Sequence, residues 1–396
     1  MELTDTAPRR KKAGHLQQKV PLNGHSKDSK PSQPIPQPQE GTEAGPVLGL
    51  IPGTLTAFVN TSPAPELSEV TALAEQEQSV QACRWDRENV SSSRPFIEAN
   101  TLEATLEEIR EGHIIPVFIK DNEPVISHVD LIEAANSIVR QFYMDEEVLQ
   151  PAIRLSHPIK GRIPEARNKP AAQLEEHEKT LYYERMAFVI EVPSVFDEVE
   201  GNRLSLCIGG VKAYNLDNLY NRKGADEHFK CFIGFKNSVC TNLSITTDGY
   251  LANVSVRSIG ELQSALRILI ENYNSNVHLH ALKELSRLPL TEAQFAKLTG
   301  RCRMYPYLPR SIQKDIAPLL FNDTQMGTVV RDFYRDDSFC RQEDGTINLW
   351  RLYNLFTDTN KSSYIDNFLD RNVNAFSFVY AIKMALDEGS LNWFLS

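Results

Sequence analysis

Residues 183–192 read YERMAFVIEV, and every second position from Met186 to Val192 is apolar. This period of two is typical of a β-strand that turns one face toward a hydrophobic core. The pattern recurs at Leu204, Leu206 and Ile208, at Phe229, Cys231, Ile233 and Phe235, and at Val254 and Val256. No helical pattern separates these strands, so the sequence predicts an antiparallel sheet.

Helical patterns lie on both sides of the strands. The clearest one has apolar residues at Leu131, Ile132, Ala135, Ile138, Val139 and Phe142. Ser127 and Asp130 form a capping box in front of it, and we expect this helix to back the sheet. Asn100 predicts the N-cap of a shorter helix, with Glu103 as its capping-box partner. After Ser258 the pattern is helical to the end of the chain, including a helix that Thr346 is expected to cap.

The expected fold class is α+β, with an antiparallel sheet backed by a helix and followed by a helical C-terminal region. We expect a disordered tail over residues 1–92, a mixed α+β sheet region over 93–257, and a helical region over 258–396 that packs on it. The tail is expected because residues 27–45 are rich in Pro, Gln, Ser and Gly. Such a stretch cannot bury enough apolar surface to offset about 1–2 kcal/mol per residue of lost backbone entropy.

Composition excludes several classes of protein. The chain has 396 residues and a formal net charge of -10, which argues against a uniformly basic nucleic-acid binder but allows a local basic groove. No stretch approaches the roughly 20 apolar residues that span a bilayer, and no apolar segment follows the N-terminal charges as in a secretory signal. The expected location is the cytoplasm, without a membrane partner.

Neither a metal nor a cofactor is expected. The six cysteines include no CxxC pair and are read as reduced thiols. His278 and His280 are two residues apart, so on a helix they point to nearly opposite faces and cannot share one metal. Gly209-Gly210 and Gly234 lie inside strand patterns, whereas a phosphate-binding loop leads into a helix. They are interpreted as bulges or as points of close backbone approach.

Cations gather in two stretches of this acidic chain. The first, residues 157–170, carries Lys160, Arg162, Arg167 and Lys169 against one carboxylate. The second lies between residues 203 and 236 and includes Lys212, Arg222 and Lys223, with Tyr214 and Tyr220 among them. Cations with interleaved aromatic rings suit single-stranded nucleic acid, through phosphate contacts and base stacking. The alternative is a loop-rich sheet edge whose lysines aid solubility.

Four phrases carry a resemblance to a known family: RPFIEANT at 94–101, VISH at 125–128, FIGFKNSVCTNL at 232–243 and WRLYNLFT at 350–357. Together they resemble a Bacteroidetes domain-of-unknown-function family of the DUF3871 type, and more distantly the phage- and plasmid-like family of the DUF932 type. Within the third phrase, the motif that marks the family is Val239, Cys240, Thr241 and Asn242. The resemblance covers about residues 96–394 and implies a bacterial, mobile-element-associated protein that handles DNA. It implies no catalytic residue.

Three hypotheses for function follow. The first is a mobile-element-associated accessory protein that binds single-stranded DNA without catalytic turnover. Its phosphate contacts would be Lys160, Arg162, Arg167, Lys169, Lys212, Arg222 and Lys223, and its stacking rings Tyr214 and Tyr220. The second is a protein–protein interaction module, such as an inhibitor of host defence or restriction. The third and weakest is an enzyme that uses Cys240 or the acidic residues between 315 and 344, since a thiol nucleophile needs a positioned base and no histidine lies near Cys240 in the sequence.

Overall fold

The stretches with an apolar residue at every second position form the main sheet. The computed structural model describes residues 94–115, 119, 123–217 and 224–396, and among them seven strands form one sheet. Their order is β1-β2-β5-β6-β7-β8, β9 also pairs with β7, and every pair is antiparallel. The strands are β1 (Leu102–Ala104), β2 (Ala152–Leu155), β5 (Arg185–Val199), β6 (Asn202–Ala213), β7 (Glu227–Asn237), β8 (Leu243–Ser244) and β9 (Tyr250–Val256). The predicted α+β class is confirmed.

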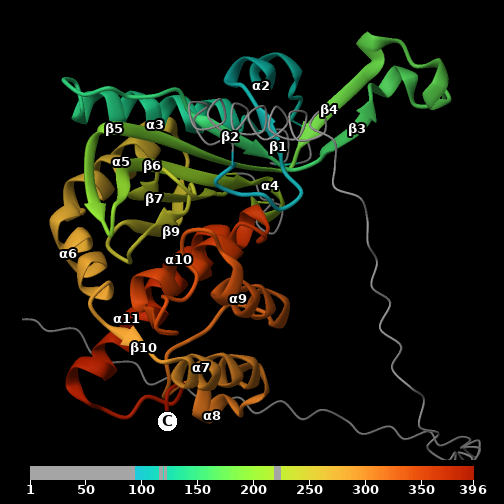
Figure 1. Ribbon diagram of the computed structural model, residues 1–396. Helices are drawn as coiled ribbons and strands as arrows, with labels where there is room; N and C mark the ends of the chain where they lie inside the picture. The colour runs from blue at the N-terminus through green and yellow to red at the C-terminus, as the bar shows by residue number, and fades with distance from the viewer. Residues whose placement is uncertain (1–93, 116–118, 120–122, 218–223) are drawn as a thin grey trace, which may run out of the picture. The chain divides into compact units, whose positions relative to one another are not determined.

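A separate two-stranded ribbon projects away from this sheet (Figure 1). It pairs β3 (Pro158–Arg162) with β4 (Lys179–Tyr183), and the loop between them contains the short 3-10 helices η2 (Pro164–Ala166), η3 (Ala171–Gln173) and η4 (Glu176–Glu178). We call residues 158–183 the arm. Its first strand follows β2 after only two residues and its second strand is one residue from β5, so the arm continues from the neighbouring ends of β2 and β5.

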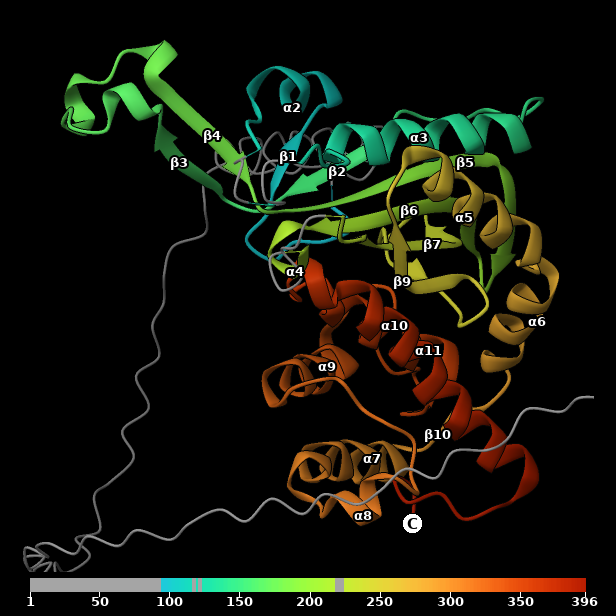
Figure 2. The ribbon, with the colours of Figure 1, turned by 180° about the vertical axis from the view of Figure 1, so that it is seen from behind.

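Helices cover both faces of the sheet (Figure 2). The helices α2 (Leu106–Gly112) and α3 (His128–Phe142) lie between β1 and β2 in the sequence. The short α4 (Tyr214–Asp217) lies between β6 and β7, and α5 (Ile259–Asn272) and α6 (Ser275–Leu285) follow β9. The C-terminal region contains α7 (Glu292–Met304), η6 (Tyr305–Tyr307), α8 (Arg310–Gln313), α9 (Asp323–Arg335), α10 (Leu349–Asn360) and α11 (Ile365–Glu388), with a short pair of strands, β10 (Pro289–Leu290) and β11 (Ile347–Asn348). None of the helices among the described residues has the length and hydrophobicity that a membrane crossing requires.

The pleat of β5 separates two apolar cores. Met186, Phe188 and Ile190 face a large core that includes the predicted stripe of α3. Ala187 and Val189 face a smaller core that contains Phe368 and Leu369 of α11. Side chains alternate between the faces of a strand, so covering both faces buries nearly every position of β5 between Met186 and Val192. The N-cap of α3 is Ser127, with the predicted capping box to Asp130.

Two predicted N-caps are wrong. Asn100 lies in a loop with φ +47°, and the cap of α2 is Thr105 with Glu108, because Leu102–Ala104 forms strand β1 against β2. Thr346 hydrogen-bonds Asp344, and α10 is capped by Asn348, because Ile347–Asn348 pairs with β10. In both places sheet pairing occupies residues that the local pattern assigned to a helix. The predicted tail, residues 1–92, lies outside the described residues.

Candidate functional site

The marker phrase forms a tight turn at the end of β7. The side-chain oxygen Oδ1 of Asn237 accepts hydrogen bonds from the backbone N–H groups of Val239 (2.9 Å) and Cys240 (3.4 Å). Thr241 follows with φ +59°, a conformation that non-glycine residues rarely adopt. Such strain persists only where the surroundings hold it in place, so the contacts of this turn decide its role.

Those contacts join segments that are far apart in the sequence. The Thr241 hydroxyl donates to the carbonyl of Pro95 at 3.2 Å, and Asn242 Nδ2 donates to the carbonyl of Asn354 in α10 at 3.2 Å. The buried Lys361, just after α10, donates from Nζ to the carbonyl of Cys240. Its own carbonyl accepts the N–H groups of residues 98 and 99, each at 2.9 Å. We call these contacts among residues 94–99, 237–242 and 350–361 the marker joint.

Three of the four resemblance phrases therefore meet at the marker joint. The phrases at 94–101, 232–243 and 350–357 supply its three segments. The fourth phrase lies elsewhere, where Ile126 N–H donates to both carboxylate oxygens of Glu227 at 3.0 Å. These contacts fasten the N-terminal segment, the sheet and the C-terminal helices to one another, which gives the marker phrase a structural role.

The geometry at Cys240 does not support a nucleophile. Its side chain is buried, its Sγ atom lies 4.0 Å from Asn354 Oδ1, and burial raises its pKa to about 12. His228, the histidine that could approach across the sheet, instead hydrogen-bonds Asp217 through its backbone N–H at 3.0 Å. A thiol that is protonated at neutral pH and has no adjacent base cannot attack a substrate efficiently.

We therefore expect Cys240 to resist alkylation in the folded protein. With a pKa of about 12, roughly one thiol in 10,000 is ionised at pH 8, and the ionised fraction rises tenfold per pH unit. Cys340 is partly exposed and serves as the internal reference. Peptide-level mass spectrometry after iodoacetamide labelling should show Cys340 reacting at least about 100-fold faster than Cys240. Equal rates would contradict the burial of the thiol and revive the enzyme hypothesis.

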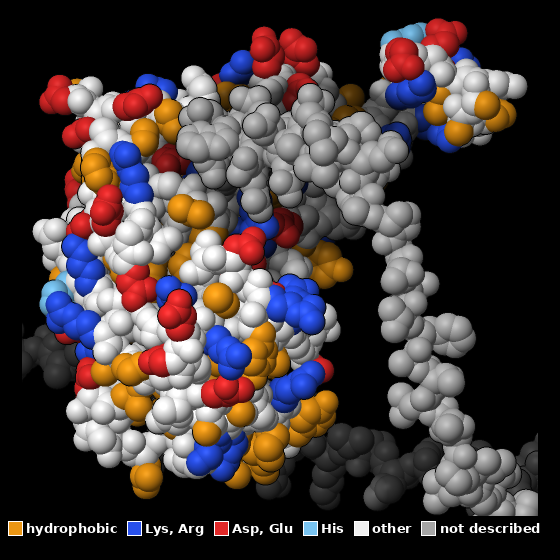
Figure 3. All heavy atoms as spheres, viewed as in Figure 1, with side chains coloured by type: hydrophobic (Ala, Val, Ile, Leu, Met, Phe, Trp, Pro, Cys, Tyr) orange, Lys and Arg blue, Asp and Glu red, His pale blue; other side chains and the backbone are white. Residues whose placement is uncertain are grey.

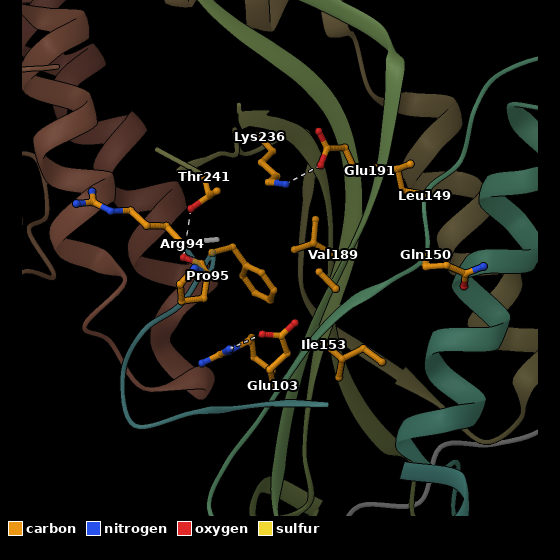
Figure 4. A pocket seen from close by; sticks show the side chains of 13 residues that line it. Arg94, Pro95, Glu103, Leu149, Gln150, Ile153, Val189, Glu191, Lys236 and Thr241 are labelled. Atoms are coloured by element: carbon orange, nitrogen blue, oxygen red, sulfur yellow. Dashed lines mark hydrogen bonds and ion pairs between the residues drawn. The ribbon is translucent and has the colours of Figure 1, made fainter. Parts of the chain in front are cut away.

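A hollow of about 320 Å³ lies beside the marker joint (Figure 4). Lys236 and Glu191 lie at one end and Glu103 at the other, while Val189 and Ile153 lie between them. Thr241 of the marker phrase also lines the hollow. We call it the joint pocket. Its size is at the lower end of the range of about 300–1,000 Å³ typical of small-molecule sites.

Charged groups at the joint pocket are largely paired. Lys236 Nζ donates to Glu191 Oε2 at 2.6 Å. Arg154 donates to the hydroxyl and carbonyl of Thr101 at 3.0 and 2.9 Å, and its Nη1 lies 3.7 Å from the exposed Glu103. Burial lowers the pKa of Arg154 despite the nearby carboxylates. The site can therefore hold a small polar group between two ion pairs.

The first predicted basic stretch lies on the arm. The register pairs Lys160 with Leu181 and Arg162 with Lys179. Paired residues share a face and alternate residues share a face, so Lys160, Arg162 and Lys179 lie on one face of the ribbon. All three are exposed. Figure 3 shows Lys and Arg side chains on the arm, next to acidic and apolar ones.

Acidic residues reduce the charge excess of the arm. Arg167 is exposed, but Lys169 forms an ion pair with the buried Glu178, and Lys179 pairs with Glu176 at 2.5 Å. Among the residues that the structure describes, Lys160, Arg162 and Arg167 make no ion pair. These three are the cations of the predicted stretch without a paired carboxylate among the described residues, and the Arg162 guanidinium also donates a hydrogen bond to the Lys169 carbonyl. Lys179 was not predicted, because only the β3–β4 register brings it beside Arg162.

Two described residues of the second predicted stretch are buried and do not contribute to a basic surface. Lys212 is fully buried, and its Nζ donates to Glu227 Oε2 at 2.9 Å and to Asp217 Oδ2 at 3.2 Å. Tyr214 is also fully buried, with its ring centroid 4.6 Å from that of His128. The predicted phosphate contact of Lys212 and the predicted base stacking of Tyr214 are therefore corrected. Tyr220, Arg222 and Lys223 lie outside the described residues.

The sequence did contain a signal for the burial of Lys212. Leu204, Leu206 and Ile208 lie on the face of β6 that meets the large core. Continuing the same period of two places position 212 on that face as well. A lysine on a core face must find carboxylates there, and Glu227 and Asp217 provide them.

The two neighbouring histidines are kept apart by their helix. His278 is buried in α6, where it bonds the hydroxyls of Ser244 (3.0 Å) and Tyr273 (2.7 Å), and burial lowers its pKa to about 3. His280 is exposed on the same helix, 4.0 Å from Glu284. Across the described ranges, no three His, Cys, Asp or Glu side chains are grouped as a metal site would need.

The fold and these sites define an α+β protein whose antiparallel sheet is covered on both faces and carries a projecting arm. Residues 86–395 match a family described as a domain of unknown function, B. Theta gene description (DUF3871). The match covers more than half of the chain, so the protein belongs to this DUF3871 family. No curated protein and no solved structure matches the chain. The more distant similarity to the DUF932 type stays a prediction.

Proposed function

We propose that this protein binds single-stranded DNA along its arm, without catalytic turnover, as an accessory protein of a mobile element in the cytoplasm. The observation that carries the proposal is the β3–β4 register, which places Lys160 and Arg162 on one exposed face beside Lys179, the last of which pairs with Glu176. A projecting ribbon with cations on one face can follow a phosphate backbone that a flat acidic surface would repel. The association with a mobile element comes from the family resemblance and is part of the proposal.

The remaining cations decide where the DNA would lie. Lys160, Arg162 and Arg167 make no ion pair with described residues, whereas Lys169 is neutralised by Glu178. Because Lys212 and Tyr214 are buried, the contact surface is shorter than the sequence predicted. A short surface with few phosphate contacts gives weak binding with a shallow salt slope, and not the affinity of a sequence-specific binder.

The test is fluorescence anisotropy of a labelled single-stranded oligonucleotide, titrated at several salt concentrations. For single strands the slope of log K against log salt is about -0.7 per phosphate neutralised. We expect the double substitution Lys160→Ala with Arg162→Ala to weaken binding at low salt and to reduce the magnitude of that slope by about 1.4.

A charge-matched control separates a local contact from a general effect of net charge. Arg303 and Arg331 lie on α7 and α9 and pair with Asp323 and Asp332. Changing both to alanine removes the same charge and should leave the slope unchanged. Binding that is absent at low salt, or a slope that the arm double mutant does not alter, would discard the proposal.

One observation favours a protein partner as the second candidate. The opposite face of the arm carries Ile159, which is 51% exposed. An exposed β-branched residue on a projecting ribbon suits a protein interface, such as contact with a host defence or restriction protein. Retention of one stoichiometric host protein by the wild type, and its loss in Ile159→Lys, would support this candidate if DNA binding is absent.

A further inference from the structure

A second hollow, of about 240 Å³, lies at the root of the arm. Its walls come from the loop at residues 99–101, from residues 156–159 where β2 passes into β3, from Glu184 and Arg185 where β4 passes into β5, and from Tyr364 and Ile365 at the start of α11. We call it the root pocket. Four segments thus enclose a space at the base of the strand that carries Lys160 and Arg162, and the Arg185 guanidinium in its wall pairs with Glu184 and Asp366.

Tyr364 gives the root pocket an aromatic wall. Its side chain is 67% exposed, although it immediately precedes the buried first turn of α11. It makes no cap hydrogen bond to that helix, and within the described ranges its ring packs on no other aromatic ring. An exposed ring with no aromatic neighbour among the described residues is available to stack on a ligand with a flat π-face.

The polar groups of the root pocket can both donate and accept hydrogen bonds. His157 Nε2 bonds Asn100 Oδ1 at 2.8 Å, and Asn100 is held at φ +47°. The Asn100 amide N–H groups have no partner among the described residues. Ser156 Oγ accepts the N–H of Arg185 at 3.1 Å, which leaves its own hydrogen free to donate. Mixed donors and acceptors beside an aromatic ring match the edge and face of a nucleobase better than they match an aliphatic side chain.

Size and position limit the ligand further. The volume is below the range of about 300–1,000 Å³ typical of pockets for whole small molecules, so it suits a single base. Among the described residues β3 pairs only with β4, which leaves its other edge free. Ile159 lines the pocket, and its neighbour Lys160 points to the opposite face of the strand. A nucleic-acid backbone along this free edge would have the cations on one side and the pocket on the other.

We propose that the root pocket holds one unpaired base of the strand bound along the arm, stacked on Tyr364 and hydrogen-bonded by Asn100 and Ser156. This inference rests on the proposed function. It explains a preference for single strands over duplex, because a paired base is not free to leave its stack. His157 and Asn100 hold each other in place and position the amide.

The experiment compares two labelled oligonucleotides of equal length. One is oligo(dT), and the other has the same backbone with abasic tetrahydrofuran units in place of every base. We expect Tyr364→Ala to weaken binding of oligo(dT) about 10-fold while leaving the abasic oligonucleotide and the salt slope unchanged. Tyr364→Phe keeps the ring and should bind like wild type. Tyr307→Ala, which removes an 88% exposed tyrosine at η6, is the matched control and should have no effect.

The outcomes separate the two proposals. If wild type binds both oligonucleotides equally, or if Tyr364→Ala weakens both to the same extent, the root pocket holds no base, while DNA binding along the arm stands. If wild type binds neither oligonucleotide at low salt, both proposals fall. A 10-fold loss confined to oligo(dT), with Tyr364→Phe like wild type, supports the base site.

Discussion

Replacing Lys212 by methionine is expected to lower the free energy of unfolding by about 3–5 kcal/mol. The ammonium group lies fully buried between Asp217 and Glu227, with its nitrogen 4.2 Å from the centroid of the Phe229 ring. Methionine fills nearly the same volume but removes the charge, so two carboxylates remain buried without their cation. The cost arises from the loss of the cation that the two carboxylates share and exceeds any loss of packing.

Chemical denaturation followed by far-ultraviolet circular dichroism measures this effect. Lys179→Met is the matched control, because the Lys179 side chain is 46% exposed and pairs with Glu176 at the surface. Its unfolding free energy should change by no more than about 0.5 kcal/mol. A loss below about 1 kcal/mol in Lys212→Met would mean that the carboxylates are hydrated and that Lys212 is accessible, which would return it to the basic surface.

Replacing Gly209 by alanine is expected to destabilise the protein by about 3 kcal/mol or more. A Cβ atom at this position in β6 would lie 2.1 Å from the carbonyl oxygen of Phe188 and 2.7 Å from the Phe232 ring. The first clash is with the backbone of a paired central strand, which cannot move without breaking the β5–β6 ladder. The register is continuous here, so of the two sequence interpretations close approach is confirmed and a bulge is not.

The substitution Gly300→Ala is expected to have the opposite effect and to stabilise the protein. Gly300 lies inside α7, and nothing within 4 Å would meet its added Cβ. Alanine lowers the conformational entropy of the unfolded chain and favours helix, so the variant should gain up to about 1 kcal/mol. If both glycine variants shifted the denaturation midpoint in the same direction, the close approach at Gly209 would be contradicted.

Together these four variants bear on function as well as on stability. The buried Lys212 removes one part of the predicted DNA surface, and the exposed cations of the arm are the part of it that the structure describes. The marker joint explains the phrase at 239–242 through contacts with Pro95, Asn354 and Lys361. The joint pocket and the root pocket both lie beside the segment at residues 94–104.

The sequence by itself determined the features that depend on near neighbours. The period of two in residues 183–192 produced a strand, and Ser127 with Asp130 capped the helix that backs the sheet. Apolar periodicity and capping act over a few residues, so they can be read before any tertiary contact is known. The α+β class followed from these local patterns.

Tertiary structure decided which of the residues suited to capping became N-caps. It also decided which of the predicted cations are exposed at the surface. Asn100 and Thr346 had the residue types of N-caps, but strand pairing at β1 and β11 claimed the neighbouring residues. Lys160 and Lys212 both lie in strands near aromatic residues, yet one is exposed on a ribbon and the other is buried against two carboxylates. Burial depends on what packs over each face of a strand, and the partners of Lys212 and Thr241 come from other segments of the chain that only the fold brings beside them.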